Sequence, residues 1–342
     1  MLRCAALVTM AVLGLSAMAT GGHASELTVA VPAGPLVQVL TGAFATPFQQ
    51  ATGTHVKVAA TDGSVDAARA AHADVMVADA AMLQAGCKAG TLQKLDWGAL
   101  GGRDRTLPGT SGDCGEGAVL CSIVLAWNRQ KFPGTPNWGE FWDVAKVPGK
   151  RGLRHSARTN LEIALLADGV APSDVYSTLR EQGGVDRAFR KLDQLKPYLV
   201  WWSTPGEAPK LLESAEVLMT SAPAAGVVAA QRGANGSADR MFALQWNGSL
   251  TIVASWAIPA GASPLAIKFL AFAADPKNQR RLPALGAYGG ATSGSTDGLP
   301  PDQLAISPST PANLANGLMV DEQFWRDNGA KLEKQFEAWL AK

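Results

Sequence analysis

Apolar and polar positions in the first hundred residues alternate between the spacing of strands and the spacing of helices. Within residues 36–52, for example, Val39, Ala43 and Phe44 fall on one face of a helix. An alternation of this kind predicts a parallel sheet with helices on its faces. The predicted elements are a strand at 27–31, a helix at 36–52, a strand at 55–60, a helix at 65–71, a strand at 74–78 and a helix at 80–85.

A second alternating unit follows a long glycine-rich segment, residues 101–117. The apolar run 118–127 predicts a strand that leaves the first unit, and the run 249–258 predicts a strand that ends at Pro259. The elements between and after them are predicted helices at 138–144, 160–167, 185–195, 209–214, 224–232, 264–274, 277–285 and 321–341, and strands at 152–154, 198–202 and 216–220.

One α/β unit is therefore interrupted by another and resumed later, which predicts two α/β lobes joined by crossing hinge strands. The expected boundaries are 25–122 for the first part of lobe 1, 123–250 for lobe 2, and 251–342 for the return to lobe 1 with the C-terminal helices. Ligands of parallel sheets bind beyond the carboxyl ends of the strands, and a hinge lets two lobes close on a solute. We expect two sheets that flank an interlobe cleft.

Residues 1–24 have the pattern of a secretory signal peptide. Arg3 is the only early charge, an apolar run extends from Cys4 to Ala19, and small residues precede Ser25. The run is shorter than the roughly 20 residues of a membrane span. We expect cleavage after Ala24 and a periplasmic location for Ser25–Lys342.

The composition limits the kinds of partner that the protein is expected to bind. The chain is 47% hydrophobic and 17% charged, and 30 basic against 29 acidic residues give a formal charge of +1. A balance this close to zero provides no field to hold nucleic acid. We expect a monomer that binds neither nucleic acid nor a cofactor.

Three cysteines remain after the expected cleavage: Cys87, Cys114 and Cys121. In an oxidising compartment two of them should pair. Cys87 with Cys114 is the favoured pair because both lie in glycine-rich, loop-like surroundings, and Cys121 lies inside an apolar run. A Cys114–Cys121 pair stays open as the alternative.

Motifs of catalysis are missing from the sequence. It contains no Gly-x-Ser-x-Gly elbow, no His-Glu-x-x-His, no phosphate-binding glycine loop and no Cys-x-x-Cys. His55, His72 and His155 are far apart in the chain, so we expect no metal site. These observations favour a binding protein over an enzyme.

Several segments resemble periplasmic solute-binding proteins of the spermidine/putrescine type, in an order and spacing that extend from about Leu27 to Leu340. They are Asn137–Asp143 (NWGEFWD), Pro148–Arg154 (PGKRGLR), Leu192–Pro197 (LDQLKP) with Val200–Trp202 (VWW), Glu216–Ser221 (EVLMTS) and Ser255–Pro259 (SWAIP). The resemblance implies a bilobal type II periplasmic-binding-protein fold that passes its solute to the membrane permease of an ABC importer. In the polyamine binders of this family, aromatic rings enclose the methylene chain and carboxylates bind the ammonium groups.

The residues that correspond to the polyamine pocket have changed. Pro32–Pro35 replaces an aromatic pair, Asp79 and Ala81 replace a serine and a tyrosine, Ala222–Ala224 replaces Trp-Asn-Gly, and Ala254 replaces the amine-binding aspartate. The resemblance still offers Tyr288 at a ring position and Arg326 at the position of a glutamine.

The candidate ligand-binding residues come from these positions and from the predicted strand ends. They are Asp62, Asp79, Trp202, Ser203, Glu207, Ser255, Tyr288 and Arg326. Each candidate also has an interpretation without a ligand. Trp202, for example, could be a ring of the core, and Asp62 and Glu207 could be solvated loop carboxylates.

Arg326 argues against a simple diammonium ligand, because a guanidinium at the cleft suits a carboxylate. Asp79 and Glu207 have the opposite charge, so a zwitterion such as an amino acid would suit both. The main hypothesis is a polyamine-type binding component of an ABC importer. The alternatives are a binder of an amino acid or carboxylate on the same scaffold, an exported binding protein without a transport role, and an exported enzyme.

Overall fold

In the computed structural model, residues 25–232 and 241–342 are described. The expected signal peptide, 1–24, lies outside these residues and stays a prediction. Among the described residues, no helix combines the length and apolar character that a membrane crossing needs.

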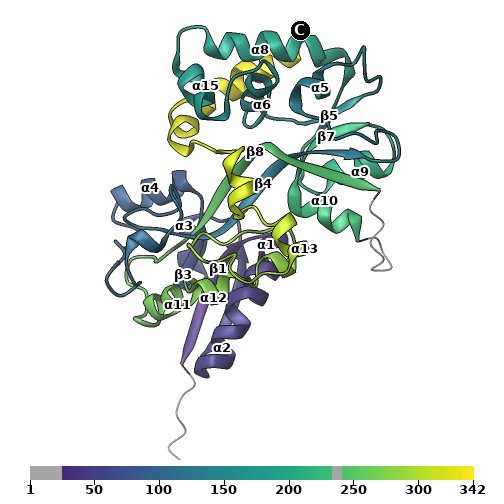
Figure 1. The fold of residues 1–342 in the computed structure, drawn as a ribbon. Coiled ribbons are helices and arrows are strands. Elements are labelled where there is room, and N and C mark those ends of the chain that lie inside the picture. Colours follow the sequence, from purple (N-terminus) through teal and green to yellow (C-terminus); the bar gives the residue numbers. More distant parts are fainter. Residues whose placement is uncertain (1–24, 233–240) are drawn as a thin grey trace, which may run out of the picture.

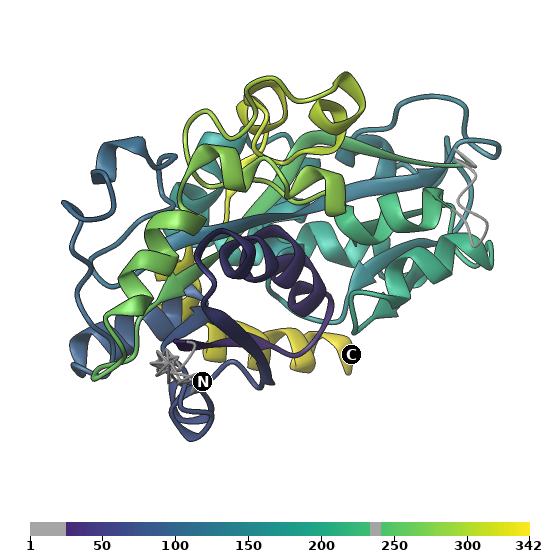
Figure 2. The ribbon, with the colours of Figure 1, turned by 90° about the horizontal axis from the view of Figure 1, so that it is seen from below.

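Two long antiparallel strands run through the whole molecule and connect two groups of elements (Figure 1). β4 (Glu116–Asn128) passes from the lower group to the upper one, and β8 (Phe242–Ala257) returns. Seen from below, helices lie on both sides of these strands (Figure 2). The two groups are the two lobes of the expected bilobal α/β fold.

Lobe 1 is built on three short strands and the helices around them. Its elements are β1 (Glu26–Pro32), α1 (Pro35–Leu40), a π-helical turn (Thr41–Ala45), α2 (Thr46–Thr52), β2 (His55–Thr61), α3 (Val65–Ala70), β3 (Val75–Ala78), α4 (Ala80–Lys88), α11 (Leu265–Ala273) and α12 (Pro276–Gln279).

Lobe 2 is built on the second set of short strands. Its elements are α5 (Trp138–Trp142), β5 (Arg151–Arg154), α6 (Asn160–Ala167), α7 (Val175–Arg180), α8 (Gly184–Leu195), β6 (Leu199–Trp202), α9 (Glu207–Glu213), β7 (Met219–Pro223), α10 (Ala224–Gln231) and α15 (Glu322–Leu340). The segment between the lobes holds α13 (Pro301–Ile306), α14 (Pro311–Ala315) and β9 (Leu318–Met319).

The described strands form one continuous sheet and not the two that we expected. The order is β2-β1-β3-β8-β4-β7-β5-β6, and β9 pairs with β8. The reason is that β4 and β8 are long enough to pair with each other across both lobes, from Glu116–Trp256 to Asn128–Phe242. The lobe boundaries that the sequence predicts, 122/123 and 250/251, fall inside these strands and stay a prediction.

In both lobes, the carboxyl ends of the short strands point toward the hinge, which β4 and β8 form. In lobe 1, Ala78 at the end of β3 pairs with Ser255; in lobe 2, Pro223 at the end of β7 pairs with Ile123. Between these levels, β4 and β8 continue the sheet, with Leu120 beside Val253, and β9 pairs with β8 at Leu250 and Thr251. The loops that follow the strands therefore face the space between the lobes, where a ligand is expected.

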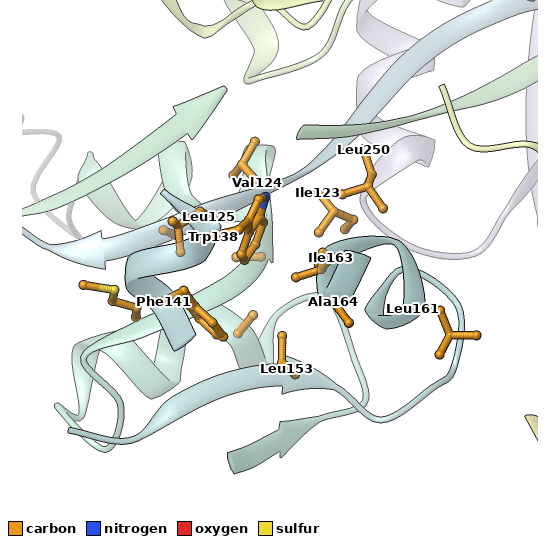
Figure 3. Packing of buried hydrophobic residues seen from close by; sticks show 14 of the residues in the cluster. Ile123, Val124, Leu125, Trp138, Phe141, Leu153, Leu161, Ile163, Ala164 and Leu250 are labelled. Atoms are coloured by element: carbon orange, nitrogen blue, oxygen red, sulfur yellow. The ribbon is translucent and has the colours of Figure 1, made fainter. Parts of the chain in front are cut away.

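Each lobe has its own hydrophobic core. The lobe 2 core includes Trp138, Phe141 and Trp142, whose i, i+3, i+4 spacing places them on one face of α5. Figure 3 shows Trp138 and Phe141 within this core. Phe141 is fully buried and its ring meets Trp138 edge to face at 5.4 Å. The lobe 1 core is centred on Phe44, Trp256 and Phe269. Separate cores are what a hinge between two rigid bodies requires.

Three element predictions need correction. The strand expected at 249–258 begins seven residues earlier, because Gly248 (φ 72°) forms an irregularity inside β8 and does not end it. The strand expected at 216–220 begins at Met219, because the chain leaves α9 through Ala215 in a left-handed conformation (φ 57°). The helix expected at 277–285 ends at Gln279 as α12, and Pro283 starts a separate 3-10 turn.

Candidate functional site

A cleft of about 1250 Å³ lies between the lobes and is lined from both of them. Its floor includes Val253 and Ser255 of β8 and the segment that leads into β9, residues 315–320. Lobe 1 contributes Ala80, Leu83, Gln84 and Cys87 from α4 and the loop Gly109–Gly115; lobe 2 contributes Pro172, Ser173, Tyr176, Ser177, Arg180, Asp321, Glu322, Gln323 and Arg326.

The lobe 1 wall consists of two segments that a disulfide joins. Cys87 of α4 is bonded to Cys114 of the loop 109–115, as the sequence predicts, so the alternative Cys114–Cys121 pair is not formed. Cys121 lies half-buried in β4. The bond fixes the loop against the helix, and both face the cleft.

Asp113 is the carboxylate of this wall. It pairs with Arg103 at 2.8 Å, and the Arg103 guanidinium lies 5.0 Å from the centre of the Trp97 ring. The hydrogen bond from Arg103 lowers the pKa of Asp113 below its usual value. The side chain is 63% exposed, and Asp113 lines the cleft.

The lobe 2 wall carries both signs of charge. Arg180 of α7 pairs at 2.5 Å with Asp321, the residue whose carboxylate caps the start of α15. Partial burial alone would raise the pKa of Asp321, but the hydrogen bonds from Arg180 and from the Phe324 amide leave this pKa below its usual value. Asp321 is therefore ionised at neutral pH.

Glu322 and Arg326 lie on the first turns of α15. Glu322 pairs with Arg158. Arg326 has a weaker partner, because its Nε lies 3.4 Å from the exposed Asp327. Of the two guanidinium groups on this wall, the one on Arg326 is thus less engaged and more available to an anionic group of a ligand.

Two of the eight candidate residues from the sequence, Ser255 and Arg326, line the cleft. Ser255 belongs to β8 and pairs with Ala78, the last residue of β3. Arg326 lies on α15. The structure thus brings a hydroxyl of the hinge and a guanidinium of lobe 2 to one cavity.

Two other candidates, each directly after a strand, make local hydrogen bonds. Asp79 caps α4, with Oδ1 accepting from the Met82 amide at 2.8 Å. Asp62 accepts from the Ser64 amide at 2.8 Å, and this bond lowers the pKa of Asp62. Neither residue lines the cavity, although Asp79 directly precedes Ala80, which does.

Glu207 and Ser203 are joined at the start of α9. The Ser203 amide donates to the Glu207 carboxylate at 2.7 Å, and this bond lowers the pKa of Glu207. Both residues are exposed and lie outside the cleft lining.

The two aromatic candidates lie in the cores. Trp202 is 2% exposed in the lobe 2 core, and its indole donates to Ser221 Oγ at 3.3 Å. Tyr288 is 8% exposed in the lobe 1 core, and burial raises its pKa to about 12. Their role in ligand binding stays a prediction.

Three residues of the cleft are not marked by any sequence pattern: Tyr176 and Arg180 of α7 and the loop aspartate Asp113. α7 has only six residues, with Val175 and Leu179 as its buried positions, which is too short for a periodic signal. Asp113 stands in a glycine-rich loop, where spacing gives no information. The neighbouring Cys114, a predicted disulfide residue, is the feature of the sequence that draws attention to this loop.

Among residues 25–232 and 241–342, no group of three or more His, Cys, Asp or Glu side chains is arranged to hold a metal ion. The polar and charged side chains that line the cleft offer hydrogen bonds and charge pairs.

A family described as bacterial extracellular solute-binding protein matches residues 43–312. The chain belongs to this family of solute-binding proteins. Among its relatives is the gamma-aminobutyric acid-binding protein of Pseudomonas aeruginosa, which is 35% identical to this solute-binding protein over 336 residues, or 95% of this chain and 94% of the relative.

Solved structures agree with the fold of this solute-binding protein. An ABC transporter substrate-binding protein from Bradyrhizobium japonicum USDA 110 superimposes with a TM-score of 0.80 at 29% identity, covering 92% of this chain and 99% of the other. The Atu4243-GABA receptor gives a TM-score of 0.77 at 25% identity, covering 93% and 98%. These relatives are solute-binding proteins of ABC transporters. They support the expectation that the protein binds a small solute, and they do not confirm that this solute is a polyamine.

Proposed function

We propose that this chain is the substrate-binding component of an ABC importer and that its solute is a small amino-acid-type zwitterion. The solute is captured in the interlobe cleft and delivered by the exported protein to a membrane permease. Gamma-aminobutyric acid (GABA) is the first compound to test, since a relative that is 35% identical along nearly its whole length carries that ligand in its name.

One observation carries this proposal: the cleft holds both signs of charge. Arg180 and Arg326 provide guanidinium groups, and Asp113 and Asp321 provide carboxylates. A zwitterion can pair each of its ends with an opposite charge, so neither end is desolvated alone. The loosely engaged Arg326 suits the carboxylate, and Asp113 across the cleft suits the ammonium group.

The polyamine alternative has less support. A diammonium ligand would bring a second positive charge toward Arg326 and Arg180. The position where polyamine binders have an aspartate is Ala254, half-buried in β8. These features disfavour a dication and leave a zwitterion favourable.

A matched series of four-carbon compounds tests the proposal. Thermal-shift measurements on refolded, ligand-stripped protein would compare GABA, putrescine and succinate, which have the same number of carbons and differ in their end groups. We expect GABA to raise the Tm and the other two to raise it less, because only a solute bound by the native state stabilises it. A larger shift with putrescine would restore the polyamine function, and no shift with any amino acid, carboxylate or polyamine would indicate a protein without a transport role.

A further inference from the structure

A buried glutamate behind the lobe 2 wall connects the segments that line it. Glu162 of α6 is fully buried. Its Oε1 accepts a hydrogen bond from the Tyr176 hydroxyl of α7 at 2.7 Å and another from the Trp325 indole of α15 at 2.6 Å. Tyr176 lines the cleft and Trp325 directly precedes Arg326, so one oxygen atom holds both helices of the wall.

Aromatic contacts extend this arrangement to the charged residues. The ring of Phe324 packs against Tyr176 at 5.5 Å and against Trp325 at 5.5 Å. The guanidinium of Arg180 lies 5.5 Å from the Phe324 ring. A shift of Tyr176 or Trp325 would therefore displace Arg180 as well as Arg326.

Burying a carboxyl group at this position costs free energy, because the group loses its contact with water. Burial raises the pKa of Glu162, and the hydrogen bonds from Tyr176 and Trp325 and the charge of Arg158 only partly oppose that rise. Its second oxygen, Oε2, has no hydrogen-bond partner among the described residues. Packing alone would be served better by an apolar side chain. What the carboxyl supplies is one acceptor that can take two donors from different helices.

We propose that Glu162 is a positioning residue of the ligand site, which sets solute affinity by fixing Tyr176 and Trp325 and, through them, Arg180 and Arg326. The inference rests on the proposed function, because the affinity concerned is that of the cleft. Glu162 does not itself line the cleft.

Variants at position 162 separate this role from general stability. Glu162→Ala removes the acceptor of the buried Trp325 indole and of the partly buried Tyr176 hydroxyl, so we expect the Kd for GABA to rise at least about tenfold. Glu162→Gln keeps a neutral acceptor oxygen in the same place, so the Kd should stay within about threefold of the native value. Both are measured by isothermal titration, with the Tm recorded beside each Kd.

Arg151→Met provides the matched control. Arg151 is also fully buried in lobe 2, and its guanidinium donates to the carbonyls of Phe141 at 2.7 Å and Val147 at 2.6 Å, but it does not line the cleft. This variant should lower the Tm and leave the Kd unchanged. Equal losses of affinity in Glu162→Ala and Arg151→Met, or native affinity in a folded Glu162→Ala protein, would overturn the inference.

Trp325→Phe serves if Glu162→Ala does not fold. It removes the indole N–H and keeps a ring at a position that is 5% exposed and outside the cleft lining. The Kd should rise several-fold, and combining it with Glu162→Gln should add less than the sum of the single effects, because the two residues share one hydrogen bond. Additive effects contradict the inference.

A measurement without ligand separates failure of this inference from failure of the proposed function. The indole proton of Trp325, identified by its loss in Trp325→Phe, should exchange slowly with solvent in the native and Glu162→Gln proteins and quickly in Glu162→Ala. Rapid exchange in the native protein would refute the positioning role even if GABA binds. Slow exchange with no binding of any four-carbon compound would refute the proposed function and also the claim that Glu162 sets affinity.

Discussion

The sulfur atoms of Cys87 and Cys114 are bonded, and this disulfide joins α4 to the loop 109–115, the two segments that form the lobe 1 wall of the cleft. The bond closes a loop with a sequence separation of 27 residues. Its position relates the stability of the protein directly to the shape of the ligand site.

Replacing both cysteines by serine should lower both stability and affinity. The chain-entropy model gives a loss of about 3.5 kcal/mol for a loop of this length. The Kd for GABA should rise as well, since the loop that carries Asp113 is no longer fixed. Urea unfolding and isothermal titration measure the two effects, and Cys121→Ser is the control that keeps the disulfide. Unchanged affinity in the double variant would show that the loop is positioned without the bond.

Glu333 should stabilise the attachment of α15 to lobe 2. Its carboxylate accepts hydrogen bonds from Ser156 Oγ at 2.6 Å and from the Ala157 amide at 2.9 Å. Glu333→Ala leaves these partly buried donors without an acceptor, so the free energy of unfolding should fall by about 1–3 kcal/mol. Lys334→Ala, exposed on the same helix, should change it by less than about 0.5 kcal/mol. Equal effects in urea unfolding would contradict this role.

Phe141 should be among the most costly residues to truncate in the lobe 2 core. It is fully buried, and its ring centroid lies 5.4 Å from that of Trp138 and 5.5 Å from that of Trp142. Phe141→Ala removes this burial and leaves a cavity, so we expect a loss of about 3–5 kcal/mol in the free energy of unfolding. Tyr198→Ala, at a ring that is 42% exposed, is the comparison and should have a small effect. A loss below 1 kcal/mol for Phe141→Ala would mean that the cluster does not pack as described.

Stability should decrease as the pH rises toward neutrality because of Glu116, the first residue of β4. Burial raises its pKa to about 7, although Arg105 at 3.5 Å opposes the rise. In the unfolded chain this carboxyl has its ordinary pKa, so between about pH 4.5 and pH 7 the folded state binds more protons than the unfolded state. The stabilisation is fully present below pH 4.5 and is lost as the pH rises through 7, up to about 3 kcal/mol.

Glu116→Gln tests this assignment, because glutamine keeps the size of the side chain and cannot ionise. The difference in the free energy of unfolding between native and variant proteins, measured in urea from pH 5 to 8, should shift in favour of the variant as the pH rises. A difference that does not change with pH would show that Glu116 does not titrate in this range.

The strand and helix pattern was sufficient for most of the fold. The helix α6 has the same bounds as the sequence predicts, and the interruption of one α/β unit by another predicted the two lobes. The single sheet does not follow from the strand pattern, because only the pairing of β4 with β8 joins the strands of the two lobes. Local sequence carries no information about that pairing.

The site was less predictable than the fold. The resemblance to the family led to Ser255 and Arg326, both of which line the cleft, and their role in binding stays a prediction. Asp62 follows β2 directly and Glu207 begins α9 after β6, but the carboxylates of both accept from nearby backbone amides, which depends on the local turn. Tyr176, Arg180 and Asp113 reach the cleft through a six-residue helix and a loop, neither of which leaves a periodic pattern.

Isothermal titration of GABA into ligand-stripped protein tests the central claim most directly, with native protein, Arg326→Gln and Lys331→Gln compared. Lys331 is exposed on α15 outside the cleft lining, so its variant matches the change in charge. We predict one site per chain, a Kd that rises at least about tenfold in Arg326→Gln and is unchanged in Lys331→Gln, and no comparable binding of putrescine. Tighter binding of putrescine than of GABA, or native GABA affinity in Arg326→Gln, would contradict the account.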